Sequence, residues 1–122
     1  RSARAFTELL DPSAFGAGYG PTQVHRAEPS FDPVGYWRGA AWPQVNYLHW
    51  SAARGRAGER DRAPADAADR IAAATVQAAV RSGLAEYWHP DTGAGLGAIP
   101  QSWTGLALVM AQGSGPVGGA GV

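Results

Sequence analysis

The sequence predicts an all-α fold of about four helices joined by long loops. In four segments of the chain, apolar residues recur at the spacing of one helix face. Between these segments lie stretches rich in turn-forming residues, which account for most of the 17 glycines and nine prolines. A chain of 122 residues has the size of a single small domain.

The first two helices are predicted at residues 3–10 and 41–53. The first is expected to stop at Asp11, and the second accommodates Pro43 in its first turn. Residues 12–39 show no sustained period and form a loop longer than compact domains usually tolerate without a functional reason. We expect the second helix to face the core with a stripe made of Trp42, Val45, Leu48 and Ala52.

The third and fourth helices are predicted at residues 65–82 and 102–112. Asp66 suits the N-terminus of the third helix, and Gly83 suits a left-handed cap after it. Its expected apolar face consists of Ile71, Val76, Ala79 and Val80. The fourth helix carries Leu106, Leu108, Val109 and Met110.

The predicted domain spans residues 1–112, and residues 113–122 form a glycine-rich tail that we expect to be flexible. A second long loop, residues 84–100, is aromatic at its start and glycine-rich at its end. Most Trp and Tyr residues lie in or beside the two loops, which predicts a helical scaffold presenting an aromatic-lined site.

Composition excludes several functional classes. Ten basic residues balance ten acidic ones, so the chain has no net positive charge to attract a nucleic acid or an anionic membrane. Cysteine is absent, and the three histidines lack metal-ligand spacing, so no metal site and no cofactor are expected. No apolar run approaches the ~20 residues of a membrane span, and the N-terminus lacks the plan of a signal peptide, which predicts a cytoplasmic protein.

The first candidate functional segment is residues 31–48, FDPVGYWRGAAWPQVNYL. Aromatic side chains at positions 36, 37, 42 and 47 surround Arg38, Gln44 and Asn46. Flat rings beside fixed hydrogen-bonding groups suit a sugar, which has apolar C–H faces and hydroxyl edges. The alternative is that the rings fill a core between helices and that Arg38 is a buried side chain tying loop carbonyls together.

The second candidate segment is residues 84–106, LAEYWHPDTGAGLGAIPQSWTGL. Glu86 lies just past a helix end beside Tyr87 and Trp88, where partial desolvation can tune a carboxylate as a general base. Asp91 is interpreted as a turn acceptor. The stretch 91–96 has too few acidic ligands for a calcium loop, and GAGLG lacks the preceding strand of a phosphate-binding turn.

Together, YWRGAAWPQVNYL and, about fifty residues later, EYWHPDTGAGLGAIPQSWTGLAL resemble the C-terminal part of glycoside hydrolase family 63. The bacterial relatives include mannosylglycerate and glucosylglycerate hydrolases. The upstream stretch LLDPSAFGAGYGPTQVHRAEPSFDP also fits, so that the resemblance covers roughly residues 6–112.

The resemblance implies an (α/α)6 toroid with a sugar pocket at one end and hydrolysis of an α-glycoside with inversion. It assigns Glu86 as the general base and Gln101 as a polar contact to the substrate. It also implies that pocket-lining rings are Tyr36, Trp37 and Trp42. Arg38 and Asn46 match motif positions that would bind substrate, although the resemblance leaves their individual roles open.

The chain departs from the family in one large respect. The family's general acid is an aspartate in a segment before these motifs, and we expect this chain to begin too late to contain it. We therefore expect this chain to be the C-terminal portion of a catalytic domain, whose remainder would be its partner together with a carbohydrate substrate. The alternative is a non-catalytic helical module that binds sugars or is a remnant. On the first hypothesis, apolar faces should stay exposed, at positions drawn from Phe6, Leu9, Leu48, Ile71, Val80, Leu106 and Val109.

Overall fold

The computed structural model describes residues 2–58 and 60–113. The glycine-rich tail predicted after residue 112 therefore lies almost entirely outside the described residues. The described residues form four α-helices: α1 (Ser2–Leu10), α2 (Pro43–Arg56), α3 (Ala63–Arg81) and α4 (Leu106–Gly113). The predicted helical fold is confirmed, with every helix boundary within a few residues of its expected place.

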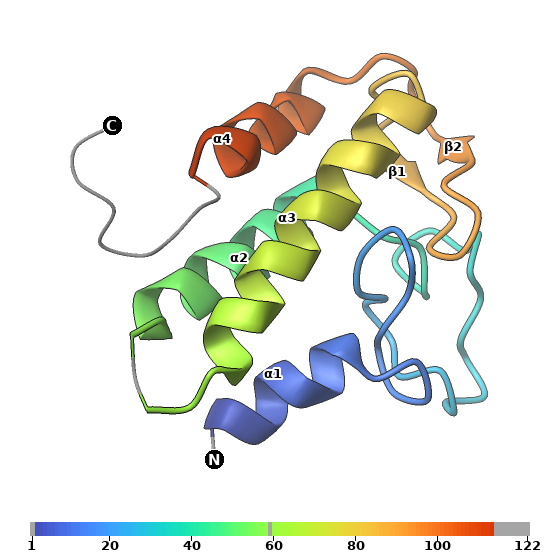
Figure 1. Cartoon of the computed structure of the whole chain (residues 1–122). Coiled ribbons are helices and arrows are strands. Elements are labelled where there is room, and N and C mark those ends of the chain that lie inside the picture. The colour runs from blue at the N-terminus through green and yellow to red at the C-terminus, as the bar shows by residue number, and fades with distance from the viewer. Residues whose placement is uncertain (1, 59, 114–122) are drawn as a thin grey trace.

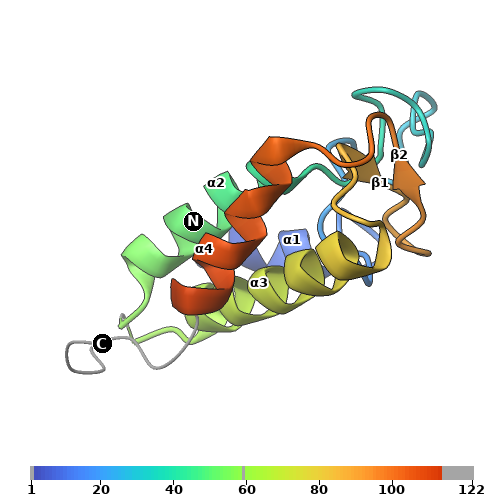
Figure 2. The ribbon, with the colours of Figure 1, turned by 90° about the horizontal axis from the view of Figure 1, so that it is seen from above.

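Helices gather at one end of the molecule and loops at the other (Figure 1). The helices α2 and α3 lie side by side and run in opposite directions, α4 packs along both, and α1 packs on α3. Seen from above, both long loops project beyond one end of the helix bundle, where α2 begins and α3 ends (Figure 2). The scaffold thus presents both candidate segments on one side.

A small hairpin lies within the loop end. Its strands β1 (Tyr87–Trp88) and β2 (Gly95–Leu96) pair antiparallel, with Tyr87 opposite Leu96 and Trp88 opposite Gly95. A short 3-10 helix, Ser102–Gly105, follows and leads directly into α4. The predicted fourth helix therefore begins with a tighter turn than the α-helical pattern indicated.

Half of the core residues at the helical end are alanines, with four large side chains between them. Small side chains let α2 and α3 approach closely, and Trp50, Ile71 and Met110 fill the space that remains. The members of this core are Phe6, Trp50, Ala53, Ala67, Ala68, Ile71, Ala72 and Met110.

Of the predicted core stripe of α2, only Trp42, at the start of the helix, is fully buried. Leu48 is 64% exposed, Ala52 is exposed and Val45 is only half-buried. The buried residues of α2 are instead Pro43, Asn46, Trp50 and Ala53. This face is the buried one because it carries Trp50, whose large apolar surface releases more free energy on burial than that of leucine.

Exposed apolar side chains lie on three of the helices, as expected for Leu48, Val80 and Val109. Of the other residues in that set, Phe6 and Ile71 are buried in the core, and Leu9 and Leu106 are half-buried. On α4 the inward residues are Ala107 and Met110, so that Leu108 also faces outward. No helix among the described residues is long and apolar enough to cross a membrane.

Candidate active site

The two candidate segments are joined by a short backbone bridge. The Ala41 N–H donates to the Trp88 carbonyl at 2.9 Å, and the Trp88 N–H donates back to the Ala41 carbonyl at 3.0 Å. In an antiparallel pair the residues flanking such a bridge face each other on one side. Trp42 and Tyr87 consequently meet, although they are far apart in the sequence.

Trp42 is the middle ring of a three-ring stack. Trp37 lies on one face, with centroids 3.8 Å apart and planes within 5°. Tyr87 stacks on Trp42 at 4.4 Å and 8°. Tyr36 meets all three rings edge-on, at centroid distances of 5.1–5.7 Å, and Trp103 approaches Trp42 at 6.3 Å.

Exposure divides the rings of this cluster into two groups. Trp42 is completely buried, whereas Tyr36 and Trp37 are about half exposed. An exposed ring can offer a face or an edge to a ligand, but a ring covered on both sides supports its neighbours. The interpretation of core-filling rings thus applies to Trp42, while the assignment of Tyr36 and Trp37 as sugar-facing rings stays a prediction.

The turn that carries Tyr36 and Trp37 is closed by its own backbone. The Asp32 N–H donates to the Arg38 carbonyl at 2.9 Å, and the Asp32 Oδ1 accepts from the Val34 N–H at 3.1 Å. Trp37 has a backbone φ of 59°, a left-handed conformation that is unusual for a bulky residue. Such strain occurs where surrounding contacts hold a side chain in a required position.

Glu86 lies at the edge of this stack, next to Tyr87. Its backbone N–H donates to the Ala98 carbonyl at 2.8 Å, and its side-chain Oε2 accepts from the Ala98 N–H at 2.9 Å. The Trp103 indole N–H donates to the Glu86 carbonyl at 3.2 Å. The other carboxylate oxygen, Oε1, accepts no hydrogen bond from any residue that the structure describes.

The pKa of Tyr87 reflects the proximity of the Glu86 carboxylate. Burial raises the pKa of Tyr87 above its ordinary value, and the negative charge of Glu86 and the neighbouring Tyr36 raise it further. A phenol with a raised pKa stays neutral at physiological pH, so it remains a hydrogen-bond donor. The half-buried carboxylate of Glu86 and the neutral phenol of Tyr87 thus lie close enough to interact electrostatically.

A second set of contacts holds the two loops together behind the stack. The guanidinium of Arg26 binds both carboxylate oxygens of Asp91, its Nε donates to the Gly16 carbonyl at 3.0 Å, and it lies over the ring of Phe31. The expectation that Asp91 accepts within its own turn is therefore wrong. His89 has that role, since its Nδ1 accepts from the backbone N–H groups of residues 91 and 92.

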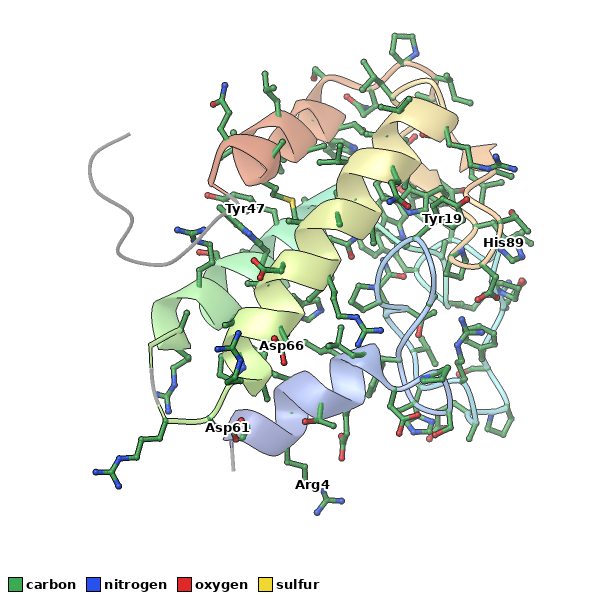
Figure 3. The ribbon with its side chains drawn as sticks, in the orientation of Figure 1. Arg4, Tyr19, Tyr47, Asp61, Asp66 and His89 are labelled. Carbon is green, nitrogen blue, oxygen red and sulfur yellow. The ribbon has the colours of Figure 1, made fainter. Side chains whose placement is uncertain are left out.

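Tyr19 and His89 lie in the loops at this end, well away from Arg4 and Asp61 at the helical end (Figure 3). The Trp88 indole N–H donates to the Tyr19 carbonyl at 2.7 Å. Trp88 therefore packs on the opposite side of β1 from Tyr87, as the alternation of a strand requires. Of the two residues that follow Glu86, Trp88 binds the loops together and Tyr87 belongs to the ring stack.

Asn46, Arg38 and Gln101 do not share one environment. The fully buried Asn46 donates to the Thr75 hydroxyl at 3.1 Å, in the interface of α2 and α3. Arg38 is exposed and lies 3.5 Å from Asp32, so the alternative of a buried arginine is wrong. The side-chain oxygen of Gln101 accepts from the Ser102 N–H at 2.8 Å and caps the 3-10 helix.

Sequence reasoning did not single out Trp103, Gly97 or Ala98. Trp103 lies in a segment whose helical period draws attention to leucines instead. Gly97 and Ala98 stand among other small residues, and only the fold of the loop brings them onto Glu86. A glycine run next to a candidate base is the signal that could have pointed to them.

A family model describing the mannosylglycerate hydrolase MGH1-like glycoside hydrolase domain matches residues 1–104. The chain belongs to this family. It is 36% identical over 114 residues to the glucosylglycerate hydrolase of Mycolicibacterium hassiacum, and the match covers 87% of this chain and 24% of that protein. It is 40% identical over 86 residues to the mannosylglycerate hydrolase of Thermus thermophilus, covering 70% of this chain and 19% of that protein.

The fold is similar to part of a solved family 63 enzyme. The crystal structure of the mannosylglycerate hydrolase from another strain of Thermus thermophilus, in complex with glucose, matches with a TM-score of 0.59 and 37% identity. The match covers 75% of this chain and 22% of that one. The chain thus spans about a fifth to a quarter of the length of these relatives, and its helical fold matches part of their (α/α)6 fold.

Proposed function

We propose that this chain carries the general base and part of the sugar pocket of an inverting α-glycoside hydrolase. The observation that carries the proposal is the half-buried carboxylate of Glu86, held through one oxygen beside a ring cluster in which Tyr36 and Trp37 are half exposed. Membership of the glycoside hydrolase family supports it. By similarity to the two hydrolases, the proposed substrates are small α-glucosides or α-mannosides such as glucosylglycerate or mannosylglycerate.

In the proposed reaction, Oε1 of Glu86 takes a proton from a water molecule. The water oxygen then attacks the anomeric carbon from the face opposite the leaving group, and the glycosidic C–O bond breaks. The leaving oxygen must receive a proton from a carboxylic acid ~6.5–9.5 Å away from the base. We propose that this acid comes from a segment that the relatives have and this chain does not span.

The exposed rings have a defined place in this proposal. Trp37 and Tyr36 provide surfaces for the apolar C–H face of the sugar, while Trp42 holds Trp37 from behind. Gln101 can still donate through its amide nitrogen, since its oxygen is used in capping. Arg38, exposed next to Asp32, is available to a substrate hydroxyl or carboxylate.

The chain by itself should hydrolyse no glycoside. Inversion needs a second carboxylic acid; of the loop carboxylates, Asp32 and Asp91 are engaged by Arg38 and Arg26, and Glu28 is exposed. Hydrolysis by the purified chain, abolished by Glu86→Gln, would contradict this assignment of the acid to another segment.

A chimera tests the proposal as a whole. In it, this chain replaces the matching segment of the M. hassiacum glucosylglycerate hydrolase, which supplies the rest of the enzyme. We expect hydrolysis of glucosylglycerate and a loss of ~10²–10⁴ in kcat on Glu86→Gln, the usual contribution of a general base. Glu28→Gln, which alters an exposed loop carboxylate, is the matched control and should leave kcat unchanged.

Two outcomes would contradict the proposal. A folded chimera that binds glucose without hydrolysing glucosylglycerate would favour the non-catalytic sugar-binding module. Equal kcat values for Glu86→Gln and Glu28→Gln would show that Glu86 is not the base.

A further inference from the structure

The turn that follows β2 encloses the carboxylate of Glu86. Ala98 makes two hydrogen bonds to this one residue, accepting from its backbone N–H at 2.8 Å and donating to its Oε2 at 2.9 Å. Glutamate side chains rotate freely unless contacts restrain them, and rotamer freedom is costly to remove. Here the backbone of the turn supplies the restraint.

Gly97, the residue before Ala98, leaves the space that the carboxylate occupies. It has a φ of +71°, and a Cβ at this position would lie 2.5 Å from the Glu86 Oε2 and 2.7 Å from the Tyr87 Cε1. Real Cβ atoms do not approach other atoms so closely. Tyr87 is stacked on Trp42 and has little freedom to move, whereas the carboxylate is the end of a flexible side chain. A methyl group at position 97 would therefore displace the carboxylate, and its clash with the Tyr87 ring would also shift the backbone of the turn.

We propose that Gly97 and the Ala98 N–H are positioning elements for the catalytic base. The bond to Ala98 uses Oε2 and turns Oε1 toward the attacking water, while the missing side chain at position 97 lets the carboxylate reach that bond. This inference rests on the proposed role of Glu86 as the base. A misplacement of ~1 Å in a catalytic group can cost about 10²-fold in rate.

The chain offers a closely matched control for a substitution at Gly97. Gly83 has the same φ of +71°, but a Cβ there would meet only the Ile99 Cγ2, at an ordinary 3.5 Å. Gly83→Ala thus introduces the same backbone strain as Gly97→Ala without touching Glu86. The comparison separates the strain of a left-handed alanine from the displacement of the carboxylate.

The experiment measures kcat and KM in the chimera defined above. Gly97→Ala should lower kcat by about 10²-fold with KM changed less than about threefold, because the base is misplaced while the sugar-binding rings remain. Gly83→Ala should keep the parent kcat and KM. In the Glu86→Gln background, Gly97→Ala should cause no further loss of kcat, because the group that it positions is already absent.

Each result decides between the two proposals. Equal kcat values for Gly97→Ala and Gly83→Ala would overturn the positioning role, as would losses that multiply in the double variant. Near-normal activity of Glu86→Gln would instead overturn the assignment of the base, and the positioning role with it.

A second measurement covers the case in which the Gly97→Ala chimera does not fold. Hydrogen exchange at the Ala98 amide should be faster in Glu86→Ala than in the parent chimera, because the carboxylate that accepts from this amide is gone. Unchanged exchange would contradict the proposed restraint.

Discussion

Removing the middle ring of the stack should destabilise the chain more than removing any ring at its edge. Trp42 is fully buried and has a ring on each face, at 3.8 and 4.4 Å. Replacing a buried tryptophan by alanine costs ~3–5 kcal/mol, and each lost aromatic pair adds ~0.5–1.5 kcal/mol. The expected loss for Trp42→Ala is therefore about 4–8 kcal/mol, comparable with the whole stability of a small domain, ~5–15 kcal/mol.

The matched control for this substitution is Trp103→Ala. Trp103 is 37% exposed, and it meets Trp42 only at 6.3 Å with tilted planes. Its removal should cost on the order of 1–2 kcal/mol, as for an ordinary partly exposed side chain. Urea unfolding of the chain, followed by far-ultraviolet circular dichroism, gives both values. Equal losses for the two variants would refute the claim that Trp42 holds the stack together.

Three further predictions concern single interactions. Glu86→Gln should lower the pKa of Tyr87 toward its ordinary value, because one of the charges that raises it is removed; an unchanged tyrosinate absorbance titration would contradict this. Burial lowers the pKa of His49, so the stability it contributes is present above its ordinary pKa of 6.5 and is lost as the pH falls through the lower folded value. His49→Gln should accordingly flatten the decline in Tm below about pH 6.5, and an equally steep decline would contradict the assignment. Arg26→Met and Asp91→Asn should show a coupling free energy of about 0.5–1 kcal/mol in a double-mutant cycle, small because Asp91 is half exposed; strict additivity would show that the pair contributes nothing.

The helices were predictable because their signals are local. Pro43 in a first turn, Asp66 near a helix start and the left-handed Gly83 after a helix end all lie where the sequence indicated. The core face of α2 was not predictable in the same way. Two faces of this helix carry apolar residues, and the choice between them depends on which one meets α3.

The candidate site shows the same division between local and distant information. The sequence indicated Glu86 and the rings of the first loop, since aromatic residues next to a carboxylate are visible in one short segment. The stack itself depends on the bridge between Ala41 and Trp88, which joins residues far apart in the chain. The place of Asn46 at a helix interface and the contact of Asp91 with Arg26 likewise depend on distant partners.

Chemical rescue of the base tests the central claim most directly. In the Glu86→Ala chimera, azide can enter the space of the missing carboxylate and attack the anomeric carbon without a base, because it carries no proton to remove. We predict that azide restores cleavage of the α-glycoside and that proton NMR shows a β-glycosyl azide, formed with inversion. Cleavage that does not respond to azide, or an α-glycosyl azide, would contradict the assignment of Glu86 as the base of an inverting hydrolase.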